Sequence, residues 1–121
     1  MFTISTETHF CASHQLTLPD GSKEPAHEHN WTVTAKISSN KLNNIGIVMD
    51  FQKLKALLDK IIVQFENTSL EKIDYFKQNN PSAENVSRYI YDQLKPQIPE
   101  GLKLQSISVV EEPGFRAKYN Q

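Results

Sequence analysis

The chain has 121 residues, and its 13 lysines and arginines against 14 aspartates and glutamates give a net charge of −1. This length is typical of one domain with a modest core, so we expect a single domain over residues 1–121. The near-neutral charge provides no basic field for a nucleic-acid partner. The one cysteine, Cys11, excludes a disulfide within the chain, and no apolar run reaches membrane-spanning length. We therefore expect a soluble, cytoplasmic protein that binds neither nucleic acid nor membrane.

The first part of the chain predicts two strands separated by a loop. Over residues 1–14, the residues Phe2, Ile4, Phe10, Ala12 and His14 share one parity, which is the period of a strand. Two prolines and a glycine interrupt residues 15–26 and predict a loop there. Alternation resumes over residues 27–37, which predicts the second strand.

The rest of the chain predicts two helices followed by two further strands. Apolar residues at spacings of three and four follow Asp50, which we expect to be the N-cap of the first helix. The second helix should have Asn80 as its N-cap and Pro81 as its first residue. Residues 102–111 and 115–119 return to a strand pattern. The order ββααββ predicts an α+β fold, with two helices on one face of a four-stranded antiparallel sheet.

Three histidines are candidates for a metal site. His27 and His29 lie two apart in the second predicted strand, so both project to the same face and can bind one ion. His14 ends the first strand, which we expect to pair with the second, whereas His9 has the opposite parity. Catalytic zinc sites use three protein ligands and keep a fourth position open. A bare H-x-H pair is also typical of surface histidines, so the residues alone leave both interpretations open.

Five segments fall in order along nearly the whole chain: "FCASH" at 10–14, "HEHNW" at 27–31, "GIVMDFQKLK" at 46–55, "NPSAENV" at 80–86 and "VVEEPGFRAKY" at 109–119. Together they resemble the motifs of the 6-pyruvoyltetrahydropterin synthase / 6-carboxy-tetrahydropterin synthase family. The resemblance implies the tunnelling fold, in which subunits join their sheets into a barrel. It also implies a homo-oligomer, typically a hexamer, with a Zn²⁺ cofactor and a small-molecule pterin bound between subunits.

The resemblance assigns roles to individual residues. His14, His27 and His29 match the family's zinc ligands. Glu111 matches the glutamate that anchors the pterin ring, because a carboxylate accepts two parallel hydrogen bonds from a 2-amino-pyrimidinone edge. Ser82, in the "NPSAENV" segment, is assigned to the substrate-binding site. Without the resemblance, Glu111 would be interpreted as a solvent-facing residue at a strand end.

The chain departs from the family at two catalytic positions. The usual cysteine before H-x-H is missing, and Glu24 stands in that loop, as in a subclass of the family in which glutamate replaces cysteine. A carboxylate there can act as a general base. The alternative interpretation is that Glu24 is an ordinary solvated residue of the loop. Glu66 and Asn67 replace the family's Asp-His pair, so Glu66 is a second candidate catalytic residue, whereas Asn67 cannot transfer a proton at neutral pH. Cys11 is expected to pack away from the site.

The resemblance implies a zinc-dependent lyase or synthase acting on 7,8-dihydroneopterin triphosphate or a related dihydropterin. Ordinary members make 6-pyruvoyl- or 6-carboxy-tetrahydropterin, the latter in queuosine biosynthesis, and the glutamate subclass releases a 6-hydroxymethyl pterin. The loss of both the cysteine and the histidine argues against the ordinary mechanism. A low-activity or non-catalytic pterin-binding paralogue is an alternative, and an interaction domain without metal is another.

Overall fold

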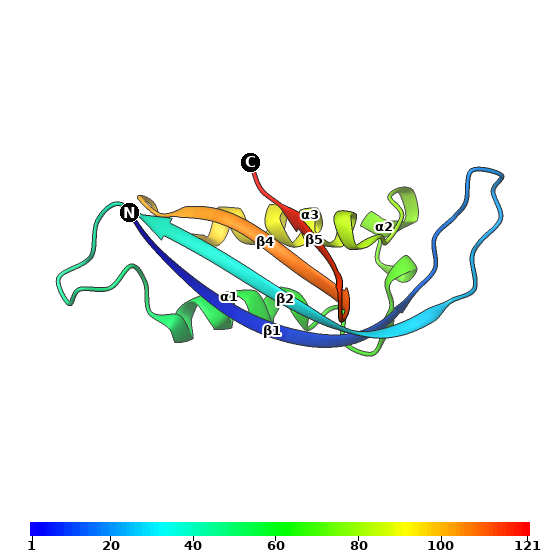
Figure 1. Ribbon diagram of the computed structural model, residues 1–121, viewed down its shortest axis with the longest axis horizontal. Helices are drawn as coiled ribbons and strands as arrows, with labels where there is room; N and C mark the ends of the chain where they lie inside the picture. The colour runs from blue at the N-terminus through cyan, green and yellow to red at the C-terminus, as the bar shows by residue number, and fades with distance from the viewer.

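A curved sheet runs along most of the length of the molecule, and a computed structural model describes all residues 1–121 (Figure 1). The strands are β1 (Phe2–His14), β2 (His27–Ser39), β3 (Thr68–Ser69), β4 (Lys103–Glu112) and β5 (Phe115–Tyr119), in the spatial order β3-β1-β2-β4-β5. The helices are α1 (Phe51–Ile62), α2 (Tyr75–Gln78) and α3 (Ala83–Leu94), with 3₁₀ turns at Leu70–Lys72 and Lys95–Gln97. No helix has both the length and the apolar character that crossing a bilayer requires.

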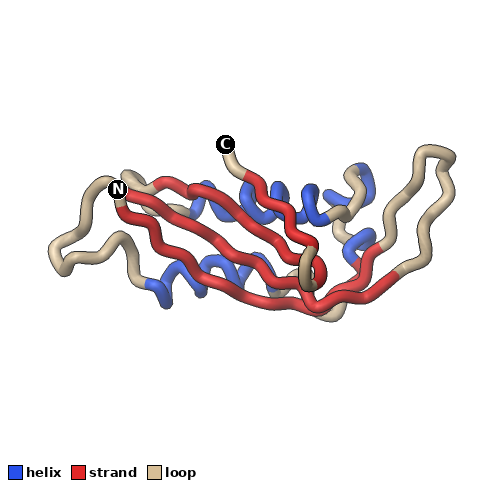
Figure 2. Tube along the Cα trace, in the orientation of Figure 1, coloured by secondary structure: helices blue, strands red, loops and turns tan.

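The core lies between the sheet and the two long helices, which cover one face of it (Figure 2). Alternate residues of β2 point into this layer, because strand side chains project to opposite faces in turn. The fully buried side chains that fill it include Trp31, Val33, Ala35 and Ile37 from β2, Leu54 and Leu58 from α1, and Val86, Ile90 and Leu94 from α3. The other face of the sheet carries no helix.

The predicted α+β fold is confirmed, but the predicted element count is not. A fifth strand, β3, pairs in parallel with β1 at Ala12 and Ser13. Its two residues are too few to show a period of two in the sequence, so the pattern could not reveal it. A short third helix, α2, also lies between the two predicted ones.

The first predicted helix start is confirmed and the second is wrong. Asp50 caps α1, and its side chain accepts a hydrogen bond from the Gln52 amide at 2.8 Å. The N-cap of α3 is Ser82 rather than Asn80, so Pro81 precedes the helix instead of opening it. Asparagine and serine are comparably good caps, and a non-local contact decides between them here.

That contact joins Asn80 to the loop after β1. The Asn80 side chain accepts from the Thr17 amide at 2.8 Å and donates to the Thr17 carbonyl at 3.0 Å. The Ser82 hydroxyl is then the group that accepts from the Asn85 amide, at 3.1 Å. The segment before α3 therefore ties the helix start to the end of β1.

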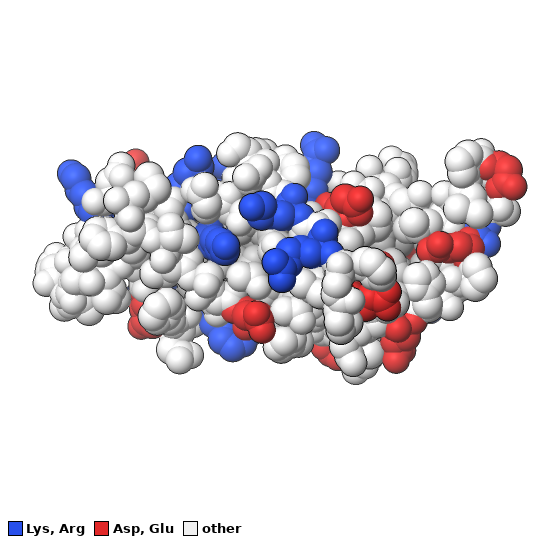
Figure 3. All heavy atoms as spheres, in the orientation of Figure 1, with Lys and Arg blue, Asp and Glu red and all other residues white.

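Charge is unevenly distributed over the molecule. Several Lys and Arg side chains gather over the middle of the sheet in Figure 3, whereas most of the Asp and Glu side chains visible there lie toward the end with the β1–β2 loop. The register places Lys118 opposite Ser108 and Lys36 opposite Ser106, so both lysines extend from the helix-free face. The end of the sheet nearest the β1–β2 loop, where His14 pairs with His27, is thus the acidic end.

Candidate active site

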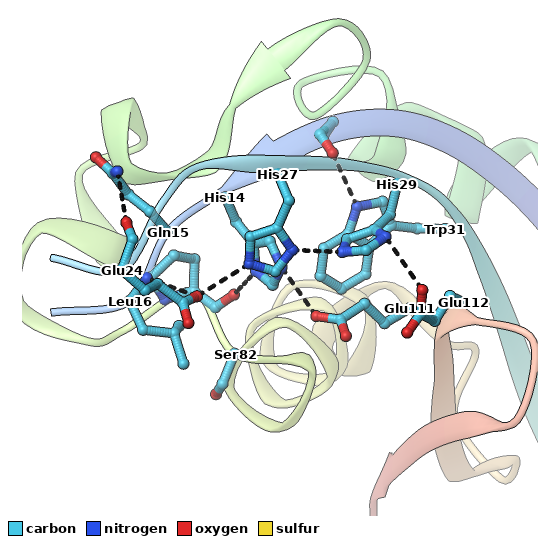
Figure 4. Close-up of polar contacts among 12 residues, drawn as sticks. His14, Gln15, Leu16, Glu24, His27, His29, Trp31, Ser82, Glu111 and Glu112 are labelled. Atoms are coloured by element: carbon cyan, nitrogen blue, oxygen red, sulfur yellow. Dashed lines mark hydrogen bonds and ion pairs between the residues drawn. The ribbon is translucent and has the colours of Figure 1, made fainter. Parts of the chain in front are cut away.

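Three histidines meet where β1 and β2 finish their pairing. His14 is the register partner of His27, and alternation along β2 places His29 on the same face (Figure 4). One ring nitrogen of each histidine lies within 4.8 Å of the others. His14 is buried, whereas the His27 side chain is 42% exposed. The cluster therefore has a buried back and an open front.

The hydrogen bonds of His14 determine which of its nitrogens faces the cluster. Its Nδ1 lies 2.7 Å from the carbonyl oxygen of Pro81, which can only accept, so Nδ1 carries the proton. In the neutral ring, Nε2 therefore presents a lone pair. This buried atom has no hydrogen-bond partner, although the Glu111 carboxylate lies 2.9 Å away. In this neutral form, a cation bound between Nε2 and the carboxylate would offset their repulsion.

The other two histidines can offer lone pairs to the same place. His27 Nε2 lies 3.1 Å from a Glu24 carboxylate oxygen and is suited to donate to it, which leaves Nδ1 unprotonated. This Nδ1 lies 2.8 Å from His29 Nε2. Three neutral imidazoles, one of them oriented by a backbone carbonyl, form a donor set typical of catalytic zinc. The residues therefore fit a zinc ion, and His9, which bonds to Thr32 at 3.1 Å, lies outside them.

Glu24 lies beside the cluster because hydrogen bonds join the two sides of the β1–β2 loop. The Glu24 amide donates to the Leu16 carbonyl at 3.0 Å, and its Oε1 accepts from the Leu16 amide at 3.1 Å. The hydrogen bond from His27 holds the pKa of Glu24 below its ordinary value, and the Leu16 amide acts in the same direction against partial desolvation. Glu24 is thus an ionised carboxylate at neutral pH.

Glu111 reaches the histidines because of an irregularity in β4. The register of β4 against β5 shifts between Val110 and Glu112, so Glu111 is the extra residue of a β-bulge. Bulges bend a strand and redirect side chains, and they are common next to functional sites. Here the bulge brings Glu111 to His14, and Glu112 also approaches His29, at 3.9 Å.

The cluster opens onto a cavity of ≈ 470 Å³, which is the size of a small-molecule site. Five of the predicted site residues line it: His14, His27, Glu24, Glu111 and Ser82. Ser82 caps α3 through the lone pairs of its hydroxyl, so its O–H is still able to donate to a ligand. His29 adjoins the cavity through the other two histidines.

Glu66 lies elsewhere within the chain. Its carboxylate is 3.4 Å from the Cys11 amide, and the Asn67 amide donates to the Cys11 carbonyl at 2.7 Å. Both residues thus hold the outer edge of β1, and neither lines the cavity. Cys11 also lies outside the cavity, and desolvation together with Glu28 raises the pKa of its thiol, which disfavours the nucleophilic thiolate.

Several contributors to the site were not predicted from the sequence. The Pro81 carbonyl and the Leu16 amide are backbone groups, which leave no side-chain signal in a sequence. Glu84 and Phe115 also line the cavity. Phe115 falls within the segment quoted for residues 109–119, but the resemblance assigned no role to it.

Known proteins resemble this chain in sequence and in fold. Residues 3–121 match the 6-pyruvoyl tetrahydropterin synthase family. The 6-carboxy-5,6,7,8-tetrahydropterin synthase of Rickettsia conorii is 26% identical, over 93% of this chain and 96% of that protein. The dihydroneopterin monophosphate aldolase of Pyrococcus furiosus is 28% identical, over 84% of this chain and 82% of that protein. The structure of Caenorhabditis elegans 6-pyruvoyl tetrahydropterin synthase matches with a TM-score of 0.87 at 23% identity, covering 99% of this chain and 95% of that one.

These relatives carry different reaction names but share one family. The family match extends over nearly the entire chain and includes every residue of the histidine cluster and the cavity. The chain therefore belongs to the 6-pyruvoyl tetrahydropterin synthase family, whose members include pterin synthases and an aldolase.

Proposed function

We propose that the protein is a zinc-dependent lyase or synthase acting on 7,8-dihydroneopterin triphosphate or a related dihydropterin. The observation that carries the proposal is the buried Nε2 of His14, which faces the Glu111 carboxylate without a hydrogen-bond partner. A cation bound there would satisfy the lone pair and the carboxylate together. The cavity beside it has the volume that a small ligand needs.

His14, His27 and His29 would hold the zinc ion. Bound zinc supplies a Lewis acid, which makes nearby hydroxyl protons of a substrate easier to remove. The protein's part in this is to fix the ligands beforehand. The Pro81 carbonyl sets the tautomer of His14, and Glu24 sets that of His27.

Glu111 is suited to hold the pterin ring by its edge. A carboxylate matches the adjacent N–H donors of a 2-amino-pyrimidinone with two parallel hydrogen bonds. The bulge in β4 turns this side chain into the cavity, and the Ser82 hydroxyl, which also lines the cavity, can donate to a polar atom of the ligand. The ligand would thus lie between β4 and the start of α3.

Glu24 is suited to take a proton from the substrate. Both of its side-chain hydrogen bonds use Oε1, which leaves Oε2 able to accept. Its lowered pKa keeps it ionised near neutral pH, which is the form that a base requires. Because Glu24 stands where ordinary members have cysteine, we propose release of a 6-hydroxymethyl pterin as the outcome.

The test is a turnover assay on purified protein loaded with zinc. Dihydroneopterin triphosphate and monophosphate are supplied separately, and the pterin products are separated by chromatography over minutes. We expect one of them to be consumed, and we expect a chelator to stop the reaction until zinc is restored. No consumption of either compound would contradict the proposed activity.

A second candidate function is a pterin-binding paralogue with little turnover. The observation that favours it is the placement of Glu66 and Asn67, which bond to the backbone of β1 and reach no part of the cavity within one chain. Tight binding of a pterin without any consumption would support this function over the enzymatic one.

A further inference from the structure

Phe115 is an exposed aromatic residue at the candidate site. Its side chain is 61% exposed, and no other aromatic ring packs against it. It lines the cavity, and among the lining residues it is the only phenylalanine, tyrosine or tryptophan. Exposed single apolar residues are common, but this one borders a cavity whose other walls are largely polar.

The β4–β5 turn places Phe115 on the cavity side of the sheet. Gly114, with φ +94, adopts a backbone conformation that favours glycine and lets the chain reverse tightly. Arg116 is the register partner of Val110, which alternation places on the helix-free face, although Arg116 also borders the cavity. Strand alternation therefore puts Phe115 on the opposite face, which is the one that Glu111 reaches.

The rest of the cavity offers no flat apolar wall. Its charged lining residues are Glu24, Glu84, Glu111 and Arg116, and its remaining apolar residues are aliphatic. A fused heteroaromatic ring has a polar edge and two apolar faces. Glu111 satisfies the edge, whereas the faces need an aromatic surface on which to stack.

We infer that Phe115 stacks on the face of the bound ring while Glu111 holds its edge, so that the pair selects flat heteroaromatic ligands with adjacent N–H donors. This inference rests on the proposed function, because it names the residue that recognises the pterin ring. Both residues belong to the same bulged hairpin, so one local structure presents the edge contact and the face contact together.

The experiment measures binding of neopterin, a stable fluorescent pterin, to zinc-loaded protein. Stacking on an aromatic ring quenches and shifts pterin fluorescence, which reports on the contact itself. Phe115→Ala should weaken binding roughly 5- to 150-fold, the range for losing one base–aromatic stack. Phe115→Trp should retain the affinity, and Phe115→Leu should lose it, since leucine supplies apolar area without a ring.

Phe51 provides a matched control. It is 59% exposed, nearly the same as Phe115, but it starts α1 and lines a different hollow. Phe51→Ala should leave neopterin affinity and fluorescence unchanged. The sedimentation mass and zinc content of every variant are measured alongside, so that a loss of assembly or of metal is recognised.

Three results would overturn the inference. They are unchanged affinity in Phe115→Ala, full affinity in Phe115→Leu, and a fall in sedimentation mass that accompanies the lost binding, which would make Phe115 a contact between subunits. Failure of the wild-type protein to bind any pterin is a separate result. It would refute the proposed function first, and the inference with it.

Discussion

His14 Nε2 and Glu111 Oε1 lie 2.9 Å apart without a hydrogen bond, while Nδ1 of the same ring donates to the Pro81 carbonyl. When the His14 ring is neutral, two electron-rich atoms face each other at the buried back of the site. The contact is unfavourable in the neutral ring and becomes favourable when a cation binds between the histidines. The first prediction follows from this relationship.

We predict that the purified protein contains zinc and that His14→Ala, His27→Ala and His29→Ala each lose it. Changes to the outer shell of a zinc site alone cost about 10–100-fold in affinity, so removing a ligand should cost at least ~10-fold. Elemental analysis of dialysed protein measures the content. His9→Ala is the control, because His9 bonds to Thr32 away from the cluster. Equal metal loss in His9→Ala would refute this ligand set.

We predict that Glu111→Ala weakens pterin binding while zinc remains bound. Losing the carboxylate leaves the donors of the ring edge unpaired, at about 1–3 kcal/mol. Neopterin titration gives the affinity, and metal analysis of the same sample gives the zinc content. An unchanged affinity would show that another group anchors the ring.

Ser82 has two roles that substitution can separate. Ser82→Ala should lower the free energy of unfolding by about 0.5–2 kcal/mol, because α3 loses its N-cap, and should also weaken pterin binding. Ser82→Asp restores an efficient cap but removes the hydroxyl donor. We therefore expect Ser82→Asp to regain stability in denaturant titration without regaining affinity. Wild-type affinity in Ser82→Asp would restrict Ser82 to a structural role.

The histidine cluster could be predicted because its determinants are periodic. Two long strands with clear alternation fix which side chains share a face, and pairing at the strand ends then brings His14 to His27. No longer-range information is needed for that step. The sequence also places Asp50 correctly, since its hydrogen bond is made within the helix it caps.

The features that could not be predicted depend on contacts distant in sequence. Asn80 is a good cap in isolation, but its bonds to Thr17 give that role to Ser82. Glu111 faces the cluster through a bulge, which appears only when β4 is aligned with β5. Glu66 lies at the outer edge of β1, where its carboxylate accepts from the Cys11 amide. No local sequence pattern predicts this contact, because the two residues are far apart in the sequence.

We predict that the protein is a homo-oligomer, with a hexamer as the expected state. The outer edge of β1 is covered only where β3 pairs with Ala12 and Ser13, and β5 is the other edge strand of the sheet. Open edges expose unpaired backbone groups, and joining sheets between subunits removes them. Sedimentation equilibrium at micromolar concentration should give about six times the chain mass of 13.8 kDa. A mass of one chain would contradict this prediction.

The final prediction concerns the base. Proton abstraction needs a basic group within about 2.6–3.2 Å of the proton, directly or through one water. Glu24 lines the cavity beside His27 with Oε2 unused, whereas Cys11 lies outside the cavity with a raised thiol pKa. Glu24→Gln keeps the shape and the contact with the Leu16 amide while removing the basicity. It should therefore lower kcat by roughly 100-fold or more, with little change in pterin affinity.

Cys11→Ser is the matched control for Glu24→Gln, since it too replaces a reactive group by a near-isosteric one. Its turnover should stay near that of the wild type, because the thiol lines no part of the cavity. Zinc content is measured in both variants, since Glu24 also orients His27 and its loss could act through the metal. A kcat defect that zinc supplementation repairs would make Glu24 a positioning residue. Loss of turnover in Cys11→Ser with an active Glu24→Gln would assign the base to the cysteine and leave the family membership intact.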